Sequence, residues 1–328
     1  MAAEVESMAY GGEVPWHGLG VSLGDETVPP WEILKKASLD WGVKKQAMFS
    51  QVMKDGKVDE LPILDYFSLI RDVDHQVLGI CGKEYQPFQN IEVFDFFNKF
   101  TEAGKMKMHI AGSLQNGKYV WALAQLTDGQ FKLIGDDINY SYLLMVSPHV
   151  WGKSMTIMFT SVRVVCWNTL NMALGKHVTE RFRILHNRTF PELKAQAQDI
   201  VEQAMIMKQV YHDNAVLLAS VAAKKEQVLE YAARLVSPNA IDSAGALDPN
   251  DMNDAARKII YNFEHGPGSQ LQSAKGTWWG AFNGVTRLID FQQGRSGQDK
   301  RLYDSWLGAK SKLKVQALEL AYEYAKAA

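Results

Sequence analysis

Residues 141–188, SYLLMVSPHVWGKSMTIMFTSVRVVCWNTLNMALGKHVTERFRILHNR, contain the pattern that decides the fold. Two apolar runs rich in β-forming residues, at 140–146 and 155–165, predict two neighbouring strands joined by a polar turn. A short helix is then expected to begin near Asn168, followed by a basic strand over 179–185. This order of predicted elements, two strands, a turn, a helix and a basic strand, favours a sheet that presents cations and aromatic residues on one face.

The basic strand carries the clearest functional signal. Side chains alternate along a strand, so Arg181 and Arg183 would share one face while Phe182 and Ile184 occupy the other. The arginines could pair with phosphates, with Arg163 joining them across the sheet. They could equally protect a solvated edge strand by their charge, and the pattern leaves both interpretations open.

Upstream of this stretch the sequence predicts a mixture of helices and strands. Pro30 can open a helix, because its missing N–H is not needed at the first helical position. Residues 42–81 have a strand-like pattern, interrupted by a turn at 72–75. Asn90 is a good N-cap for a following helix that has several phenylalanines on one face.

A hairpin is predicted next. Residues 107–114 and 118–126 alternate apolar side chains around Asn116-Gly117, which is the strongest short-range hairpin signal. A second tight turn is expected over 126–129, where Asp128-Gly129 follows the second strand.

After Pro191 the pattern becomes helical. The sequence therefore predicts an α+β chain, with an antiparallel or mixed sheet domain over 1–189 and an all-α region over 190–328, which could pack on the first as one unit. Of adjacent Trp278 and Trp279, we expect at most one to point straight into a core, so that the other is partly exposed or packs between elements. The predicted C-terminal helices span 193–220, 225–236, 251–263, 277–291 and 299–326.

Composition bounds the function only loosely. The chain has 328 residues, 47% hydrophobic and 22% charged, with a formal net charge of -2. Dedicated DNA-binding proteins are usually basic overall, so this balance counts against a polyanion partner without excluding one. Cys81 and Cys166 lie in apolar contexts and predict buried thiols. With no apolar run long enough for a membrane span, we expect a protein of the cytoplasm and no membrane partner.

Signatures of catalysis or cofactor binding are missing from the sequence. Gly152-Lys153-Ser154 matches the end of the phosphate-loop motif. A phosphate loop is followed by a helix, whereas the residues after Ser154 predict a strand. A hairpin turn is the better interpretation. The 8 histidines show no zinc-site spacing, and Asp136-Asp137 suggests a loop or helix-cap role. We expect no catalytic residues, no metal and no cofactor.

Cations near tryptophans are the remaining candidates. Exposed indoles can stack on unpaired bases while cations follow the phosphates. A second excess of positive charge is predicted on the C-terminal helices, where Lys310 and Lys314 are one helical turn apart. These side chains either contact a polyanion or form a solvated helix face. The predicted nucleic-acid-binding residues are Trp151, Lys153, Arg163, Trp167, Asn168, Lys176, Arg181, Arg183 and Arg188.

Several short motifs are scattered along the chain, at residues 15–20, Tyr85, Gln89-Asn90, 112–114 with Gly117, 163–166, 168–170, 279–281, Asn283 and Val285-Thr286. Together they give the chain a resemblance to the phage/plasmid-like protein family, a domain of unknown function carried by phages and mobile elements. Members often carry Ser-His-Asp-Gly-Ser between the two central strands, whereas residues 147–154 here lack the acid. The resemblance implies a phage or mobile-element context and a host-cell cytoplasm, without an established activity.

These observations lead to three hypotheses. The first is a non-enzymatic homo-oligomer that binds single-stranded nucleic acid and anneals strands in replication or recombination. The second is a phage factor that binds a host protein through its helical region. The third is a metal-dependent nuclease or hydrolase built from scattered His, Asp and Glu residues.

Overall fold

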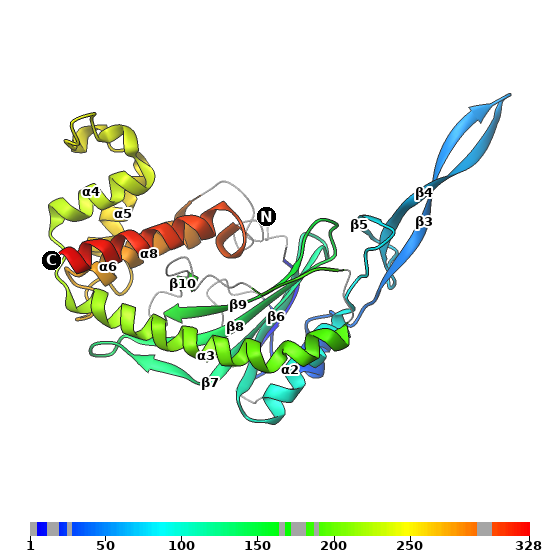
Figure 1. Ribbon diagram of the computed structural model, residues 1–328, viewed down its shortest axis with the longest axis horizontal. Coiled ribbons are helices and arrows are strands. Elements are labelled where there is room, and N and C mark those ends of the chain that lie inside the picture. The colour runs from blue at the N-terminus through cyan, green and yellow to red at the C-terminus, as the bar shows by residue number, and fades with distance from the viewer. Residues whose placement is uncertain are drawn as a thin grey trace. The chain divides into compact units, whose positions relative to one another are not determined.

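The computed structural model describes residues 5–11, 20–24, 28–163, 168–171, 182–186, 190–293 and 304–328 (Figure 1). The chain is α+β, with mixed sheets in its first part and helices in its last. By its contacts it divides into two compact units. One comprises Met1–Thr127, Leu143–Met158 and Arg181–Glu202, and the other comprises Asp128–Tyr142, Phe159–Glu180 and Gln203–Ala328.

Two sheets hold the strands. The larger has the order β10-β9-β8-β7-β6-β1-β2, with β11 also paired to β9, and the smaller has the order β3-β4-β5. The first sheet is mixed, because β1 and β2 run parallel while the other registered pairs are antiparallel. The strands are β1 (Val5–Tyr10), β2 (Val21–Ser22), β3 (Val43–Lys54), β4 (Lys57–Arg71), β5 (Val77–Gly82), β6 (Met106–Leu114), β7 (Tyr119–Lys132), β8 (Ile138–Pro148), β9 (Met155–Arg163), β10 (Asn168–Asn171) and β11 (Phe182–Ile184).

The helices follow the predicted pattern closely. The α-helices are α1 (Pro30–Lys36), α2 (Asn90–Glu102), α3 (Phe190–Ser220), α4 (Lys225–Val236), α5 (Asp254–His265), α6 (Trp278–Arg287) and α8 (Ala309–Ala327). A π-helical turn, Leu288–Gln292, continues α6. Pro30 is the first residue of α1, as predicted, and α4 spans the predicted residues.

The hairpin between β6 and β7 confirms the Asn-Gly prediction. Leu114 pairs with Tyr119, and the connecting residues Gln115, Asn116 and Gly117 all have positive φ. The second turn expected over 126–129 is wrong, because β7 continues to Lys132.

The start of α2 corrects another prediction. The N-cap is Gln89 rather than Asn90, and the Glu92 side chain accepts a hydrogen bond from the Gln89 backbone N–H at 3.0 Å. Asn90 is instead fully buried, where its side-chain amide donates to the carbonyl oxygens of Leu39 and Trp41. Its Oδ1 lies 3.0 Å from His149 Nε2, so the residue ties the helix start to the turn after β8.

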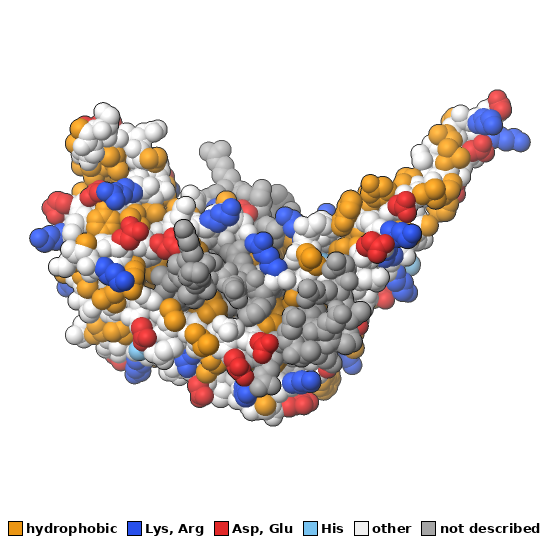
Figure 2. Space-filling view, in the orientation of Figure 1, with side chains coloured by type: hydrophobic (Ala, Val, Ile, Leu, Met, Phe, Trp, Pro, Cys, Tyr) orange, Lys and Arg blue, Asp and Glu red, His pale blue; other side chains and the backbone are white. Residues whose placement is uncertain are grey.

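A long ribbon leaves the first unit (Figures 1 and 2). Strands β3 and β4 pair from Val43↔Arg71 to Lys54↔Lys57, with an irregularity between Ala47 and Met48 where residues 64–66 of β4 have no partner in β3. Strand β5 pairs only with Tyr66–Ile70 near the base. We call the part beyond β5, residues 48–63, the arm. Its turn, Asp55-Gly56, has φ of 50° and 74°, as a two-residue hairpin turn with the twist of the strands requires.

In the second unit, aromatic residues of α6 form the centre of the core. Trp278 and Trp279 are both fully buried, so of the two expected outcomes partial exposure is wrong and packing between elements remains. Trp278 stacks on Tyr324 with ring centroids 4.7 Å apart, and Trp279 packs edge-on against Tyr211. The two indoles are buried on different sides of one helix, because the helix itself is covered on both.

Candidate functional site

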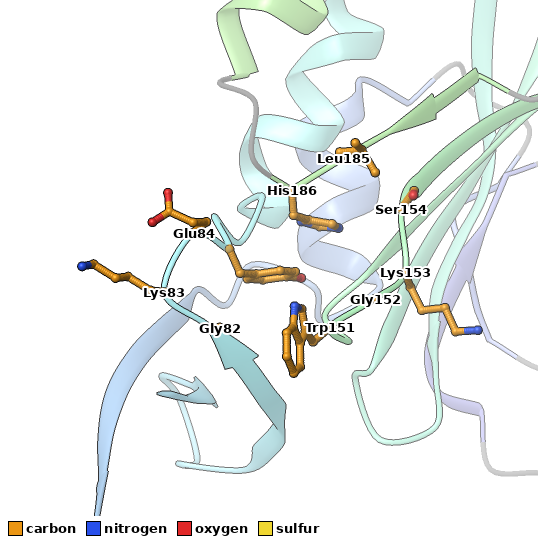
Figure 3. Close-up of a pocket in the computed structure, with 10 residues that line it drawn as sticks. Gly82, Lys83, Glu84, Trp151, Gly152, Lys153, Ser154, Leu185 and His186 are labelled. Carbon is orange, nitrogen blue, oxygen red and sulfur yellow. The ribbon is translucent and has the colours of Figure 1, made fainter. Parts of the chain in front are cut away.

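A pocket of about 370 Å³ lies in the first unit, where three separate segments meet (Figure 3). The segments are the end of β5 with the loop after it, the turn between β8 and β9, and the two residues after β11. Its size is that of a small-ligand site. The lining residues are Gly82, Lys83, Glu84, Tyr85, Trp151, Gly152, Lys153, Ser154, Leu185 and His186.

Trp151 presents its indole at the mouth of this pocket. The residue is 52% exposed, and its ring meets that of Tyr66 edge-on, with centroids 5.9 Å apart. The indole also packs against Gly82, where an added Cβ would lie 3.4 Å from the ring, an ordinary van der Waals contact. Gly152 follows with φ of 77°, which is why the β8–β9 turn can place the indole outward.

The floor of the pocket is a stack of rings. His186 lies 4.5 Å from Tyr85 with ring planes 17° apart, and 4.6 Å from Phe88. Tyr85 is held in place by its hydroxyl, which donates to the carbonyl oxygen of Pro148 at 3.2 Å. The stack gives the pocket a flat, mainly apolar base.

His186 itself is buried and neutral. Burial lowers the pKa of His186 to about 4, although its ring nitrogen Nδ1 lies 3.1 Å from the carbonyl oxygen of Gln86. That acceptor fixes the proton on Nδ1. Within the described residues, Nε2 is buried and has no hydrogen-bond partner. The neutral form is favoured because an imidazolium buried there would lose its hydration.

The rim of the pocket carries the charges. Lys83 and Lys153 are exposed and point outward on opposite sides of it (Figure 3), and Glu84 is the acid among the lining residues. Lys45 adds a third ammonium group nearby, because it donates to the carbonyl oxygens of Lys83 and Tyr85 at 2.6 and 3.1 Å. The local balance is positive although the whole chain is not.

Strand β11 brings Arg183 beside the same pocket. It pairs with β9 in the register Arg183↔Thr156, and Leu185 and His186 at its end line the pocket. Arg183 is exposed and Ile184 is buried, which confirms the predicted alternation at these two positions. The Arg183 side chain therefore lies on the solvent-exposed face of β11.

Of the nine predicted binding residues, three have described side chains, and all three lie at this pocket. Trp151 and Lys153 line it, and Arg183 lies two residues before Leu185. Arg163 and Asn168 pair through their backbones in β9 and β10, so the helix expected from Asn168 is wrong. The other four, which lie outside the described residues, are Trp167, Lys176, Arg181 and Arg188.

The second cation cluster does not form a surface as predicted. Lys314 is fully buried, and its Nζ lies 2.6 Å from Asp290 Oδ1 and 2.7 Å from Ser305 Oγ. Burial lowers its pKa, opposed by the charge of Asp290. Lys310 donates to the carbonyl oxygen of Gln293 at 2.9 Å. A solvated face through Lys314 is excluded because the side chain does not touch solvent.

Asp137 has a structural role that the sequence did not reveal. Its Oδ2 accepts a hydrogen bond from Ser273 Oγ at 2.5 Å and another from Trp279 Nε1 at 2.9 Å, and the residue is fully buried. It lies in the turn just before β8. A loop role was expected for this carboxylate, but its partners lie more than a hundred residues away and no local pattern identifies them.

The described residues hold no group of three or more His, Cys, Asp or Glu side chains that could bind a metal ion. None of the helices in the described part is both long and apolar enough to cross a bilayer. Cys81, predicted to be buried, has no exposed surface, and Cys166 falls outside the described ranges.

Comparison with known proteins gives one match. A family model described as "Domain of unknown function (DUF932)" matches residues 77–307, which is more than two thirds of the chain and includes every lining residue of the pocket. No curated protein and no solved structure matches the chain.

Proposed function

Because this chain belongs to the DUF932 family, whose domain has no assigned function, its role has to come from its own residues, and we propose that it binds single-stranded nucleic acid at the Trp151 pocket. The observation that carries the proposal is the half-exposed indole of Trp151 above a flat aromatic floor, with cations on the rim. Base stacking on such a ring is tolerant of sequence.

The charges support a backbone contact. Lys83 and Lys153 extend from opposite sides of the pocket, and Arg183 stands on the adjoining edge strand. A strand whose base stacks on Trp151 would carry its phosphates past these groups. Neutral His186 supports stacking rather than phosphate binding, because at physiological pH it contributes a ring and no charge.

Geometry favours an unpaired strand over a duplex. A pocket of about 370 Å³ can hold one small ligand or one nucleotide, and a base within a duplex would have to be flipped out before it could enter. An unpaired base is available without that cost.

In a phage or mobile-element setting, such a protein would protect or anneal strands during replication or recombination. Annealing requires neighbouring copies to hold two strands, so this part of the proposal depends on self-association. A host-protein partner bound through the helical region stays a prediction, as does a metal-dependent nuclease.

The test is binding of a fluorescent oligonucleotide, measured by anisotropy with the full chain at several salt concentrations. We expect binding to the single strand, weaker binding to the matched duplex, and an affinity that falls with salt as phosphate contacts are screened. Equal affinity for both forms, or no binding at low salt, would contradict the proposal. Cleavage of the oligonucleotide with magnesium, abolished by a chelator, would favour the nuclease instead.

A further inference from the structure

One polar atom of the Trp151 pocket has no hydrogen-bond partner. His186 lines the pocket and is only 4% exposed. Its Nδ1 carries the proton and donates to the carbonyl oxygen of Gln86, which leaves Nε2 with a lone pair that can only accept. No donor within the described residues reaches Nε2. A buried acceptor without a donor destabilises the protein that contains it, so a ligand that supplies the donor is favoured there.

Neighbouring side chains cover the faces of this imidazole and leave one edge for the pocket. The rings of Tyr85 and Phe88 pack against it, with centroids 4.5 and 4.6 Å away. The Gln86 carbonyl lies at Nδ1. The edge that carries Nε2 is thus the one left to face the pocket, and Figure 3 shows the ring between Leu185 and the indole of Trp151.

The acceptor is shielded by side chains that have room to move. Nε2 is buried, so a ligand reaches it only if part of the pocket wall shifts. Leu185 and Trp151, two apolar side chains of the lining, are 56% and 52% exposed, and exposed side chains change rotamer rapidly. A hydrogen bond made behind them is shielded from competing water, which strengthens it.

The other polar groups of the lining do not take the place of this acceptor. Figure 3 shows Lys83, Glu84 and Lys153 extending away from the pocket, so their charges lie on its rim. Ser154 adds a hydroxyl, which can donate as well as accept. Of the lining side chains, the imidazole of His186 is therefore the one whose free position in the interior accepts and cannot donate.

A flat ring with an N–H on its edge matches a stacking floor that has an acceptor at its side. Each nucleobase is such a ring, because adenine and cytosine carry an amino group on the pairing edge and guanine and thymine carry a ring N–H there. In a duplex this N–H is bonded to the partner base. An unpaired base can offer it to the protein, as a flipped base does in enzymes that read its pairing edge.

We propose that Nε2 of His186 accepts a hydrogen bond from the pairing edge of an unpaired base held in the Trp151 pocket. The inference rests on the proposed function and names the part of the strand that the site recognises. Because all four bases carry a suitable N–H, the contact selects unpaired bases rather than a sequence. A base held in this way cannot pair, so it has to leave the pocket before two strands can anneal.

Two oligothymidylates test this hydrogen bond with the wild-type chain. Thymine in a strand has a single N–H, at N3, and N3-methylthymine has none, while both keep the flat ring and the same backbone charge. We expect the unmodified strand to bind about 2- to 10-fold more tightly in an anisotropy titration at fixed salt, which is the contribution of one neutral hydrogen bond.

His186→Phe separates the hydrogen bond from the bulk of the added methyl group. The variant keeps an aromatic ring and removes Nε2, so we expect it to bind both strands with similar affinity. His265→Phe, at an exposed histidine of α5, is the matched control and should keep the preference of wild type. In wild-type protein with isotope-labelled histidine, the Nε2 resonance of His186 should shift when the unmodified strand is added and shift less with the methylated one.

These measurements distinguish the hydrogen bond from the proposed function. A wild type that binds both strands alike, or a preference that persists in His186→Phe, would overturn the hydrogen bond while leaving single-strand binding intact. Failure to bind either strand at low salt would overturn both proposals.

Discussion

Gln89 joins the base of the arm to the first turn of α2 through a two-way contact with Val43. The side-chain oxygen of Gln89 accepts from the Val43 N–H at 2.9 Å, and its amide donates to the Val43 carbonyl oxygen at 3.1 Å. The same residue is the N-cap of the helix. The direction of the ribbon and the start of the helix are thus fixed by a single residue.

Removing that side chain should loosen the base of the ribbon. We expect Gln89→Ala to lower the free energy of unfolding by about 1–3 kcal/mol, because it leaves both backbone groups of Val43 without these partners. Amide hydrogen exchange of Val43 should accelerate. Gln86→Ala, whose side chain is exposed nearby, should change neither measurement appreciably.

Trp151→Ala tests the stacking surface. We expect the affinity for a single-stranded oligonucleotide to fall by about 1–3 kcal/mol, or roughly 5- to 150-fold, because one base loses its aromatic partner. Anisotropy titration at fixed salt measures the change. Tyr261→Ala removes an aromatic ring that is 61% exposed in the second unit, and it should bind like wild type.

The cations on the rim of the pocket should affect how strongly oligonucleotide affinity depends on salt concentration, and not which bases are preferred. Alanine substitution of Lys153 or Arg183 should reduce the log–log salt slope by about 0.7 for each phosphate on a single strand that is no longer neutralised. Lys312→Ala removes an exposed cation of α8 and serves as the control. A slope equal to that of wild type in both rim variants would contradict their proposed contact with phosphates.

Three histidines, buried His149 and His186 and half-buried His109, should make the protein less stable in acid. Burial lowers the pKa of His109 and of His186 to about 4 and that of His149 to about 3. The unfolded chain protonates these residues near pH 6.5, so unfolding takes up protons between about 6.5 and 4. Stability is therefore complete above 6.5 and falls as the pH drops through this window.

Near pH 5 each such histidine should contribute about 1.4 kcal/mol per pH unit to the slope. Urea unfolding at a series of pH values measures it. His186→Phe should reduce the slope of unfolding free energy against pH by about 1.4 kcal/mol per pH unit near pH 5. Above pH 7 the slope should not change. An unaltered acid slope would mean that His186 is not held neutral in the folded protein.

Lys314→Met should be strongly destabilising. The substitution leaves the carboxylate of Asp290, whose side chain is 6% exposed, without its ammonium partner, and breaking a buried pair in this way costs about 3–5 kcal/mol. Denaturant unfolding measures the decrease. Combining it with Asp290→Leu should recover much of the stability, because no unpaired charge then remains, and exposed Lys312→Met should lie within about 0.5 kcal/mol of wild type.

The sequence predicted those elements whose signals are local. The Asn116-Gly117 hairpin, the Pro30 helix start and the alternation of Arg183 with Ile184 each depend on neighbouring residues and were correct. Asp55-Gly56 carries the same kind of turn signal, yet the arm was not predicted. Its strands have apolar side chains on both faces, so the alternation that marks a strand against a core is missing.

The candidate site was predicted only in part, for a related reason. Trp151, Lys153 and Arg183 could be proposed from their chemistry and their closeness in sequence. The aromatic floor could not, since Tyr85 and His186 meet across a hundred residues. Burial also changed the role of one cation. Lys314 was expected on a helix surface, whereas in the fold it is half of an internal ion pair with Asp290.

The uncovered ribbon also has a consequence for local stability. Beyond β5 its two strands have only each other as partners within the described residues, and a two-stranded ribbon without a core is marginally stable in water. The turn at Asp55-Gly56 should therefore be the first place that a protease cuts the folded chain, while the rest of the first unit stays protected.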